Sequence, residues 1–588
     1  MVSLGESPLQ PACLRILSLI LASGSVGITC PGLGEDTQRQ VPNLAEHLRR
    51  PVALIVANES LQIGNRRSGT ITVVELADSR IVAEHAVAER IADMAKLNSS
   101  GEILVVDDAK RRLLKVSLAG QGALVRPIAE LPVDPSKVCV ATDRREVYLT
   151  AKWPRRVMAV TFDKQYERAE HFKSMHLPFA PQELLLLDNN KTLLIADAFG
   201  GQIAIVDVER WKLGGVRELE AHNIRGLAVT ADGKRLHVAH QQMIHTLADY
   251  EELHWGRMVK NVVQVLDVDK FLSGNFRREV NGWLHAHGNI GGATGDPAGV
   301  ITGPGGTSAV ALSGVGEVAV CHGGYVKRIS VGERPEALAF GRGTLYVANR
   351  FGDSVSIIDL KRGKLDKTIS LGPAPELTAA ERGEKLFYDA SLSHDGWMSC
   401  HSCHPDGHSG GLLVDTLGDG DYGAPKRVPS LLGTRDTGPW GWTGRVASLG
   451  EQVRSSVLTT MHGGPLDDGQ ALDLVAFLES LPPPPAPPPK NRDAVHRGRV
   501  VFRSHGCEDC HKSPLFTSKR TFDVGLADER KRRSFNPPSL RGVSQRARFF
   551  HDGRASSLED VLLLVRHKLA EPLSEDESAA LLAYLRSL

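Results

Sequence analysis

The strongest constraint on the fold is a β-strand unit that recurs between about residues 51 and 372. Its clearest copies are Thr192–Gly200 followed by Gln202–Asp207, and Thr344–Gly352 followed by Ser354–Asp359. Alternating apolar and β-branched residues predict a strand in each part, separated by turn residues. Weaker copies begin at Leu54, Glu102, Glu146, Leu236 and Glu317. Seven copies spaced by about 45 residues predict a seven-bladed, all-β propeller, because each small sheet needs neighbours to bury its faces.

After Pro375 the pattern changes from strands to helices. Residues 376–387 predict a helix with Thr378 and Glu381 as a capping box, and residues 468–481 predict another. A proline-rich run, residues 482–489, is typical of a semi-rigid connector. A second helical unit follows and repeats the first: Pro429–Gly433 matches Pro538–Gly542, and residues 465–481 match residues 572–588 without a gap.

Each helical unit contains one C-x-x-C-H motif, Cys400–His404 and Cys507–His511. This spacing allows two thiols to bond the vinyl groups of a haem while the adjacent histidine binds the iron. The main alternative is a four-cysteine zinc site, but zinc ribbons separate their cysteine pairs by roughly 12–20 residues, far fewer than lie between these pairs. The motifs therefore predict two covalent c-type haems, held by Cys400, Cys403, Cys507 and Cys510, with His404 and His511 on the irons. His401, inside the first motif, is interpreted as a spacer.

Two parts of the chain resemble known families. Residues 383–389, then Leu392-Ser393 and the first C-x-x-C-H, resemble the first haem domain of bacterial di-haem cytochrome c peroxidases and MauG-like enzymes, and residues 549–554 with Ser557–Asp560 resemble the second. Tyr346–Asn349, with the preceding Gly332/Pro335 turn, resembles YVTN-type β-propellers. The first resemblance covers about residues 376–588, and fusion to a propeller departs from the best-known members.

The peroxidase resemblance implies a distal pocket at the first haem. The family's tryptophan between the haems falls on Trp442, in a turn where Thr443 replaces the usual aspartate, and its distal glutamine falls on Gln452. The catalytic glutamate falls on His462, which either handles protons or ligates the iron. Met461 is a second candidate ligand. The resemblance also allows for a bound calcium ion.

The second haem lacks the distal methionine that the resemblance implies. No methionine follows Met461 in the chain. His567 is the nearest residue able to ligate iron, and a surface histidine near a helix end is the competing interpretation.

The fifth copy of the repeat is interrupted by an insertion, about residues 241–301, with a glycine-rich run and several histidines. It is interpreted as a lid over the first haem or as a docking surface. The histidines of the propeller faintly resemble those of copper-binding propellers, but their spacing is irregular, and scattered core or loop histidines are the preferred interpretation. The histidines in question are His222, His237, His240, His245, His254, His285, His287 and His322.

The ends and the overall charge bear on location and partners. The apolar run Ile16–Gly24 has the length of a signal-peptide core, and Gly27–Cys30 loosely resembles a lipoprotein cleavage site. No later segment is long and apolar enough to be a transmembrane helix. Lys and Arg number 70 against 69 Asp and Glu, which argues against nucleic acid as a partner.

The predicted architecture is multidomain: signal peptide and linker (1–50), propeller (51–372), first haem domain (373–481), proline-rich linker (482–491) and second haem domain (492–588). Both haem domains are expected to be all-α and class I cytochrome c-like. The predicted function is that of a periplasmic or otherwise exported oxidoreductase that acts on peroxide, a small molecule or a protein partner. A small cytochrome c or a cupredoxin is the expected electron-transfer partner. A non-catalytic electron-transfer protein with the propeller as docking module is the alternative.

Overall fold

The computed structural model describes residues 44–588, apart from residues 58, 99–100, 120–121, 188–189, 245, 276–281 and 287. The expected export signal, Gly27–Cys30, His245 and His287 lie outside the described residues. Among the described helices none is both long and apolar enough to cross a membrane.

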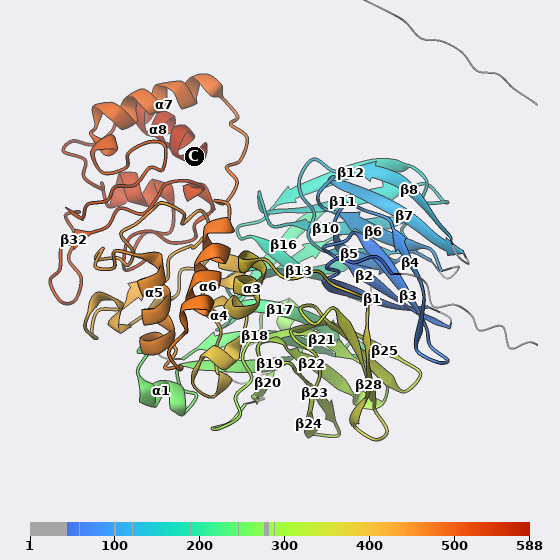
Figure 1. Ribbon diagram of the computed structural model, residues 1–588. Coiled ribbons are helices and arrows are strands. Elements are labelled where there is room, and N and C mark those ends of the chain that lie inside the picture. The colour runs from blue at the N-terminus through green and yellow to red at the C-terminus, as the bar shows by residue number, and fades with distance from the viewer. Residues whose placement is uncertain are drawn as a thin grey trace, which may run out of the picture. The chain divides into compact units, whose positions relative to one another are not determined.

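Seven four-stranded antiparallel sheets follow one another along the chain, so the predicted seven-bladed propeller is confirmed (Figure 1). In each sheet the strands pair in sequence order, as a meander. The first four blades are β1 (Pro51–Ala57), β2 (Ser60–Asn65), β3 (Thr70–Glu75), β4 (Arg80–Ala86); β5 (Ile91–Lys96), β6 (Ile103–Asp107), β7 (Arg112–Ala119), β8 (Gly122–Glu130); β9 (Val138–Ala141), β10 (Glu146–Ala151), β11 (Arg156–Phe162), β12 (Ala169–His176); and β13 (Pro181–Leu186), β14 (Thr192–Asp197), β15 (Gln202–Asp207), β16 (Lys212–Glu218).

The other three blades complete the ring. They are β17 (His222–Val229), β18 (Arg235–Met243), β19 (Val259–Asp267), β20 (Gly282–Ala286); β21 (Pro297–Thr302), β22 (Ser308–Leu312), β23 (Glu317–His322), β24 (Tyr325–Ser330); and β25 (Pro335–Gly341), β26 (Thr344–Asn349), β27 (Ser354–Asp359), β28 (Lys364–Ser370). The first strand of each blade contacts the first strand of the next, and β1 contacts both β5 and β25. Asp353 helps to close the ring by accepting hydrogen bonds from the backbone amides of Arg49 (2.9 Å) and Arg50 (2.6 Å).

Apolar contacts between adjacent sheets form the propeller core. One cluster joins the second and third blades, with Leu104, Val106 and Leu113 facing Val147 and Leu149, all fully buried. Strands with such continuous burial are expected where both faces of a sheet are covered.

Five of the seven repeat copies predicted from the sequence coincide with the second strand of a blade, and two do not. Leu54 lies in the first strand β1, and Glu317 begins the third strand β23. The expected insertion is also smaller than predicted, because β19, β20 and β21 fall inside it. The true additions are short: a segment with helix α1 (Tyr250–His254) and a second with helix α2 (Val268–Ser273).

The C-terminal region contains six α-helices among the described residues: α3 (Ala379–Phe387), α4 (Cys400–Cys403), α5 (Leu449–Ser455), α6 (Asp468–Ser480), α7 (Arg492–Ser504) and α8 (Glu575–Arg586). Two two-stranded sheets accompany them, β29 (Leu413–Val414) with β30 (Lys426–Arg427) and β31 (Phe522–Asp523) with β32 (Ser534–Phe535). The predicted helix starts are confirmed, including the capping box of Thr378 and Glu381. The all-α description is not confirmed, because helices are few and long irregular segments join them.

The duplication of the C-terminal region is visible in its packing. Helix α3 packs on α6, and α7 packs on α8. A glycine makes each crossing close: a Cβ at Gly383 would lie 1.9 Å from the carbonyl oxygen of Asp473, and one at Gly498 would lie 2.0 Å from that of Ala580. The proline-rich segment joins the two units and packs on both, with Pro483 against Gly433 and Pro484 against Gly542.

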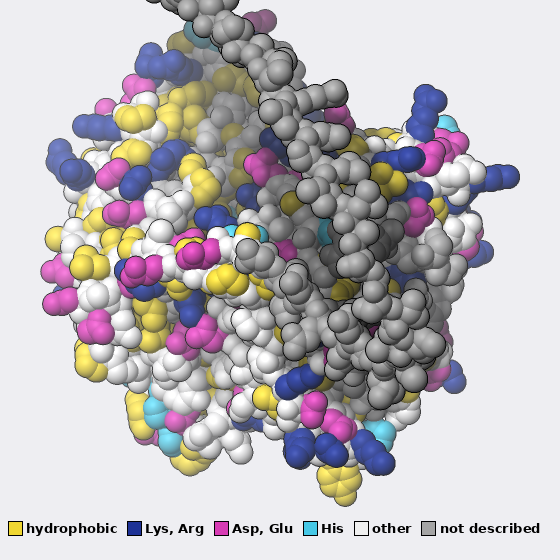
Figure 2. Space-filling model, turned by 45° about the vertical axis from the view of Figure 1, so that its right-hand side comes forward, with side chains coloured by type: hydrophobic (Ala, Val, Ile, Leu, Met, Phe, Trp, Pro, Cys, Tyr) yellow, Lys and Arg dark blue, Asp and Glu magenta, His cyan; other side chains and the backbone are white. Residues whose placement is uncertain are grey.

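The visible surface carries no large single-sign region. Figure 2 shows lysine and arginine side chains interspersed with aspartate and glutamate, as expected for 70 basic and 69 acidic residues.

Candidate functional site

The first C-x-x-C-H motif forms the short helix α4 at the wall of a cavity of about 330 Å³. Ser399 caps this helix, accepting a hydrogen bond from the amide of His401, while the side chain of Ser402 bonds back to the amide of Ser399. Cys400, Cys403 and His404 all line the cavity. Both thiols are neutral at ordinary pH, since burial raises the pKa of Cys400 and of Cys403 to about 12.

His404 is held in the tautomer that iron ligation needs. Its Nδ1 lies 3.0 Å from the carbonyl oxygen of Pro429 and donates to it, which leaves the lone pair on Nε2. Burial lowers the pKa of His404 to about 4, so the imidazole is neutral. An orienting hydrogen bond on one ring nitrogen and a free lone pair on the other are the usual state of a metal-binding histidine.

Gln452 and Met461 also line this cavity. They lie on a continuous helical segment in which α5 passes into η7 (Ser456–Thr460), a π-helix, an element often found at functional sites. Met461 is 4% exposed. The Nε2 of Gln452 donates to the hydroxyl of Ser456 at 3.1 Å, while its Oε1 is buried without a partner among the described residues.

The side chain of His462 does not line this cavity. Its backbone is left-handed (φ 49°), and its Nε2 lies 3.1 Å from the carbonyl oxygen of Ala248, in the segment before α1. Its ring meets Tyr250 edge to face, with centroids 6.0 Å apart. The cavity lining includes Met461 and not His462. A distal role for His462 therefore stays a prediction, and this geometry favours Met461 for that position.

Trp442 lies between the two units. Its Nε1 donates to the carbonyl oxygen of Arg427 at 2.7 Å, and the guanidinium of Arg427 lies 5.0 Å from the centre of the Trp442 ring. The first cavity is also lined by residues of the second unit, among them Asn536, Arg541 and Arg546. The two haem-binding units thus share one wall, which the sequence motifs alone do not indicate.

The second motif repeats the arrangement of the first. The Nδ1 of His511 donates to the carbonyl oxygen of Phe516 at 3.1 Å, and burial is the main cause that lowers the pKa of His511 to about 4. Cys507 begins the short helix η8 (Cys507–Asp509), and Cys510 follows it. The side chains of Phe502, Phe549 and Tyr584 belong to the apolar cluster that packs around Cys507.

His567 acts electrostatically on His511: after burial, its charge contributes to the lowered pKa of His511. The pKa of His567 is itself lowered by burial and then by Lys568. Its Nδ1 is buried without a hydrogen-bond partner among the described residues. An orphaned imidazole nitrogen near the motif histidine fits a ligand on the opposite side of an iron.

The chain around His567 can be compared with that around Met461. The second unit also has a π-helix, η10 (Asp560–Leu564), and Val565 N bonds to Asp560 O (2.8 Å) as Met461 N bonds to Ser456 O (3.0 Å). Val565 therefore occupies the place of Met461, and His567 lies two residues beyond it.

The propeller holds the first motif from the side opposite the cavity. Asp296, which follows the fifth blade, accepts hydrogen bonds from the hydroxyls of Ser399 and Ser402. The Nε2 of Gln241 donates to Ser402 Oγ at 3.0 Å, and the Nε2 of His222 lies 3.1 Å from the carbonyl oxygen of Ser402.

His401 is enclosed in the same contact, which agrees with its interpretation as a spacer. Its side chain is 1% exposed, and its Nδ1 and Nε2 lie 3.6 Å and 3.4 Å from carboxylate oxygens of Asp296 and Asp406. Asp406 in turn pairs with two propeller cations, Lys152 at 2.5 Å and Arg225 at 3.0 Å.

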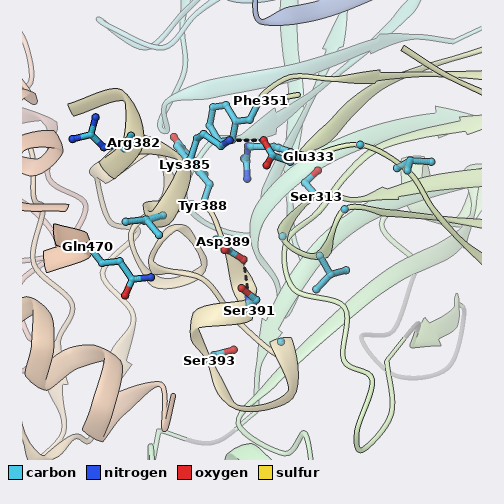
Figure 3. Close-up of a pocket in the computed structure, with 18 of the residues that line it drawn as sticks. Ser313, Glu333, Phe351, Arg382, Lys385, Tyr388, Asp389, Ser391, Ser393 and Gln470 are labelled. Carbon is cyan, nitrogen blue, oxygen red and sulfur yellow. Dashed lines mark hydrogen bonds and ion pairs between the residues drawn. The ribbon is translucent and has the colours of Figure 1, made fainter. Parts of the chain in front are cut away.

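A second cavity, of about 940 Å³, lies between α3 and the strands of the sixth and seventh blades (Figure 3). Polar side chains line much of it. Lys385 Nζ pairs with Glu333 at 2.5 Å, and Asp389 accepts a hydrogen bond from the amide of Ser391 at 2.8 Å. This cavity is separate from the C-x-x-C-H motifs.

Comparison with known proteins agrees with this geometry. Residues 378–478 match the family model of the di-haem cytochrome c peroxidases. The C-terminal third is thus cytochrome c peroxidase-like.

Curated relatives fall in the same group. A cytochrome c551 peroxidase of Pseudomonas aeruginosa is 26% identical over 35% of this chain and 78% of its own length. A cytochrome c551 peroxidase of Nitrosomonas europaea is 24% identical over 36% of this chain and 79% of its own. The methylamine utilization protein MauG of Methylorubrum extorquens is 27% identical over 31% of this chain and 66% of its own. These relatives support an oxidoreductase of the di-haem peroxidase type.

The residues of the cytochrome c peroxidase-like region fit c-type haem. Besides the two thiol pairs and neutral histidines, the first cavity has two guanidinium groups, the buried Arg427 and the half-buried Arg546, with no carboxylate partner among the described residues. Burial lowers the pKa of Arg546 to about 10, and burial together with Arg546 lowers that of Arg427 to about 9. Such cations favour an anionic partner, and the propionates of a haem supply one. Sequence reasoning missed both arginines, because only folding brings the two units together.

Proposed function

We propose that this protein is an exported di-haem c-type oxidoreductase that reduces peroxide or oxidises a small molecule or a protein partner. One observation carries the proposal: Cys400, Cys403, His404, Trp442 and Gln452 converge on a single cavity. Bound haem supplies the redox chemistry, and the chain supplies ligands, spacing and proton handling.

Each side chain has a defined task in this proposal. His404 and His511 present neutral Nε2 atoms to the irons, each oriented by a backbone carbonyl. The amide of Gln452 faces the substrate position, and its buried, unpartnered Oε1 is available to a proton donor. Trp442 would lie between the two haems, held by the hydrogen bond that its Nε1 donates to the carbonyl oxygen of Arg427.

The finer architecture is part of the proposal. We infer two class I-like cytochrome c domains, 373–481 and 492–588, joined by linker 482–491. The paired crossings of α3 with α6 and of α7 with α8 support this division, since each has a glycine at the point of closest approach.

The propeller, residues 51–372, acts as the binding module in this proposal. Its contacts with Ser402 and Asp406 seat the first haem loop, and its other surfaces remain for a partner such as a small cytochrome c or a cupredoxin. Export is inferred from the covalent attachment of haem that the two C-x-x-C-H motifs predict.

A second candidate is a non-catalytic electron-transfer protein, and the position of Met461 favours it. A thioether 4% exposed in the cavity wall is suited to occupy the sixth position of the first iron. Peroxide binds readily only to an iron with an open or water-ligated position.

The spin state of each ferric haem separates the two candidates. The full-length, haem-loaded protein is examined by electron paramagnetic resonance, fully oxidised and after one-electron reduction, and peroxide consumption is measured with a reduced small cytochrome c as donor. The oxidoreductase requires a high-spin signal in at least one state together with turnover. Only low-spin signals, from both haems in the oxidised state and from the remaining ferric haem after one-electron reduction, without turnover, would establish the electron-transfer protein instead.

A further inference from the structure

Two histidines and an aspartate meet beside the first haem unit, outside the haem cavity. His254 is the last residue of α1, the helix added to the fifth blade (Figure 1), and His394 and Asp395 belong to η4 (His394–Gly396), just before the first C-x-x-C-H. His254 Nδ1 lies 2.9 Å from His394 Nε2, and His394 Nε2 lies 3.6 Å from Asp395 Oδ2. One donor atom from each of the three residues lies within 4.8 Å of the others.

These separations suit a single metal ion. Zinc binds imidazole nitrogen at about 2.0–2.1 Å and carboxylate oxygen at about 2.0–2.2 Å. Two donors at such distances lie roughly 2.9–3.5 Å apart for bond angles between octahedral and tetrahedral. The observed 2.9 Å and 3.6 Å are close to that range, so small side-chain rotations bring the three atoms onto one ion.

The surroundings hold the three residues in place and leave them accessible. The ring of Tyr250 stacks on His254 at 5.5 Å and contacts His394 at 4.9 Å, between centroids. Asp395 accepts a hydrogen bond from the amide of Gly291 at 2.8 Å through Oδ2. The side chains of His394 and Asp395 are 21% and 22% exposed, and Asp395 also lines the 940 Å³ cavity, so an ion can reach them from solvent.

We infer that His254, His394 and Asp395 form a site for a divalent transition-metal ion of the zinc type. Two imidazoles and one carboxylate select such ions over calcium or magnesium, which prefer oxygen ligands. With three protein ligands, the remaining coordination positions belong to water or a small ligand.

Because of its position, a bound ion would link the propeller to the first haem unit. The amide of His394 bonds to the carbonyl oxygen of Met461 at 2.9 Å, so η4 is tied to the residue at the distal wall of the first haem cavity. An ion shared by His254 and His394 joins the blade helix α1 to this segment. Metal binding is therefore expected to stabilise the contact between propeller and haem unit. The inference stands independently of the proposed oxidoreductase activity.

Zinc titration of the full-length, haem-loaded protein tests the site. The chain is stripped with a chelator, titrated with Zn²⁺ by isothermal calorimetry, and dialysed for zinc-to-iron analysis. We expect one zinc per two irons, with an affinity that falls at least about tenfold in His254→Ala and in Asp395→Asn, because each loses a ligand. His496→Ala replaces a histidine that is exposed on α7. It is the matched control and should bind zinc as the wild type does. X-ray absorption at the zinc edge should show imidazole scattering from two histidines.

Haem content and the thermal unfolding midpoint without zinc show whether each variant is folded. If His254→Ala does not fold, the conservative Asp395→Asn variant still tests the site. A wild-type chain that binds no zinc would overturn the site. So would His254→Ala and Asp395→Asn chains that bind zinc as tightly as His496→Ala. In those cases the two imidazoles are only a hydrogen-bonded pair.

Discussion

Trp442 and His551 lie edge to face, with ring centroids 6.4 Å apart and an angle of 72° between their planes. They are equivalent residues of the two duplicated units. Each occupies the middle of a turn closed by a β-bridge, Trp440 with Val446 in one unit and Phe549 with Ala555 in the other. Because equivalent positions meet, the two units face each other through the same turn, and the shared wall of the haem sites follows from the duplication.

Met461 and His462 can be separated by substitution. Met461→Leu keeps the buried volume, at a cost below about 1.5 kcal/mol, but removes the sulfur. If Met461 ligates the first iron, the variant should become high-spin and bind cyanide faster, because the sixth position opens. His462→Ala, which removes contacts with Ala248 and Tyr250 outside the cavity, should leave the optical spectrum and cyanide binding unchanged. The reverse pattern would place His462 in the distal pocket.

The second haem should lack methionine ligation, since no methionine follows Met461. Replacing methionine by a nitrogen ligand lowers a haem potential, so this haem is expected to be the low-potential one. Redox titration with near-infrared magnetic circular dichroism measures both properties. Bis-histidine bands that vanish in His567→Ala, and persist in His496→Ala, would support ligation by His567. A methionine–iron band assigned to this haem would contradict it.

Two glycine substitutions in the first haem unit should change stability in opposite directions. Gly383→Ala forces a methyl group against the carbonyl oxygen of Asp473, and overpacking of this kind costs about 1–3 kcal/mol. Gly450, in α5, has open space around its Cβ position, so Gly450→Ala should stabilise the protein by up to about 1 kcal/mol. Thermal unfolding of the haem-loaded chains measures both. A neutral Gly383→Ala would show that α3 and α6 separate easily.

The contact of Asp296 with the first motif should depend on pH. Burial opposes its charge, but the facing His401 and Arg334 and the hydroxyl of Ser399 outweigh burial and hold the pKa of Asp296 at about 2, below its ordinary 3.8. The folded state therefore favours the carboxylate, and this stabilisation is complete above about pH 4 and is lost as the pH falls towards 2.

Asp296→Asn tests that dependence by denaturant unfolding at several pH values. The variant should be less stable than the wild type at pH 6, and the difference should shrink between pH 4 and pH 2.5. Asp366→Asn, on the exposed strand β28, serves as the control for removing a carboxylate. A difference that stays constant with pH would mean that the charge of Asp296 does not stabilise the contact.

Much of the fold was predictable because its signals are local. The strand pattern of Thr192–Asp197 repeats at regular intervals, and the number of blades follows from it. The positions of Leu54 and Glu317 in their blades were misjudged, because similar alternation occurs in several strands of one sheet. The stretch Val259–Asp267 was assigned to an insertion for a different reason: its flanking polar segments interrupt the repeat.

The grouping of Cys400, Cys403 and His404 at one cavity was also predictable, since these residues are adjacent in sequence. The opposite side was not. The π-helix before Met461 and the left-handed backbone of His462 decide which of two neighbouring side chains faces the cavity. No sequence pattern marks a one-residue change of helical register. Arg427 and Asp296 were missed because their partners lie in other parts of the chain.

His401 and Ser402 are enclosed against the propeller, which bears on the order of haem attachment and packing of this loop. The seated loop presents 1% of His401 and none of Ser402 to solvent. We therefore expect haem attachment at Cys400 and Cys403 to precede the packing of this loop on the propeller. The propeller precedes the haem units in the chain, so it is expected to fold before them. Packing of the mature loop on the propeller would then complete assembly of the molecule.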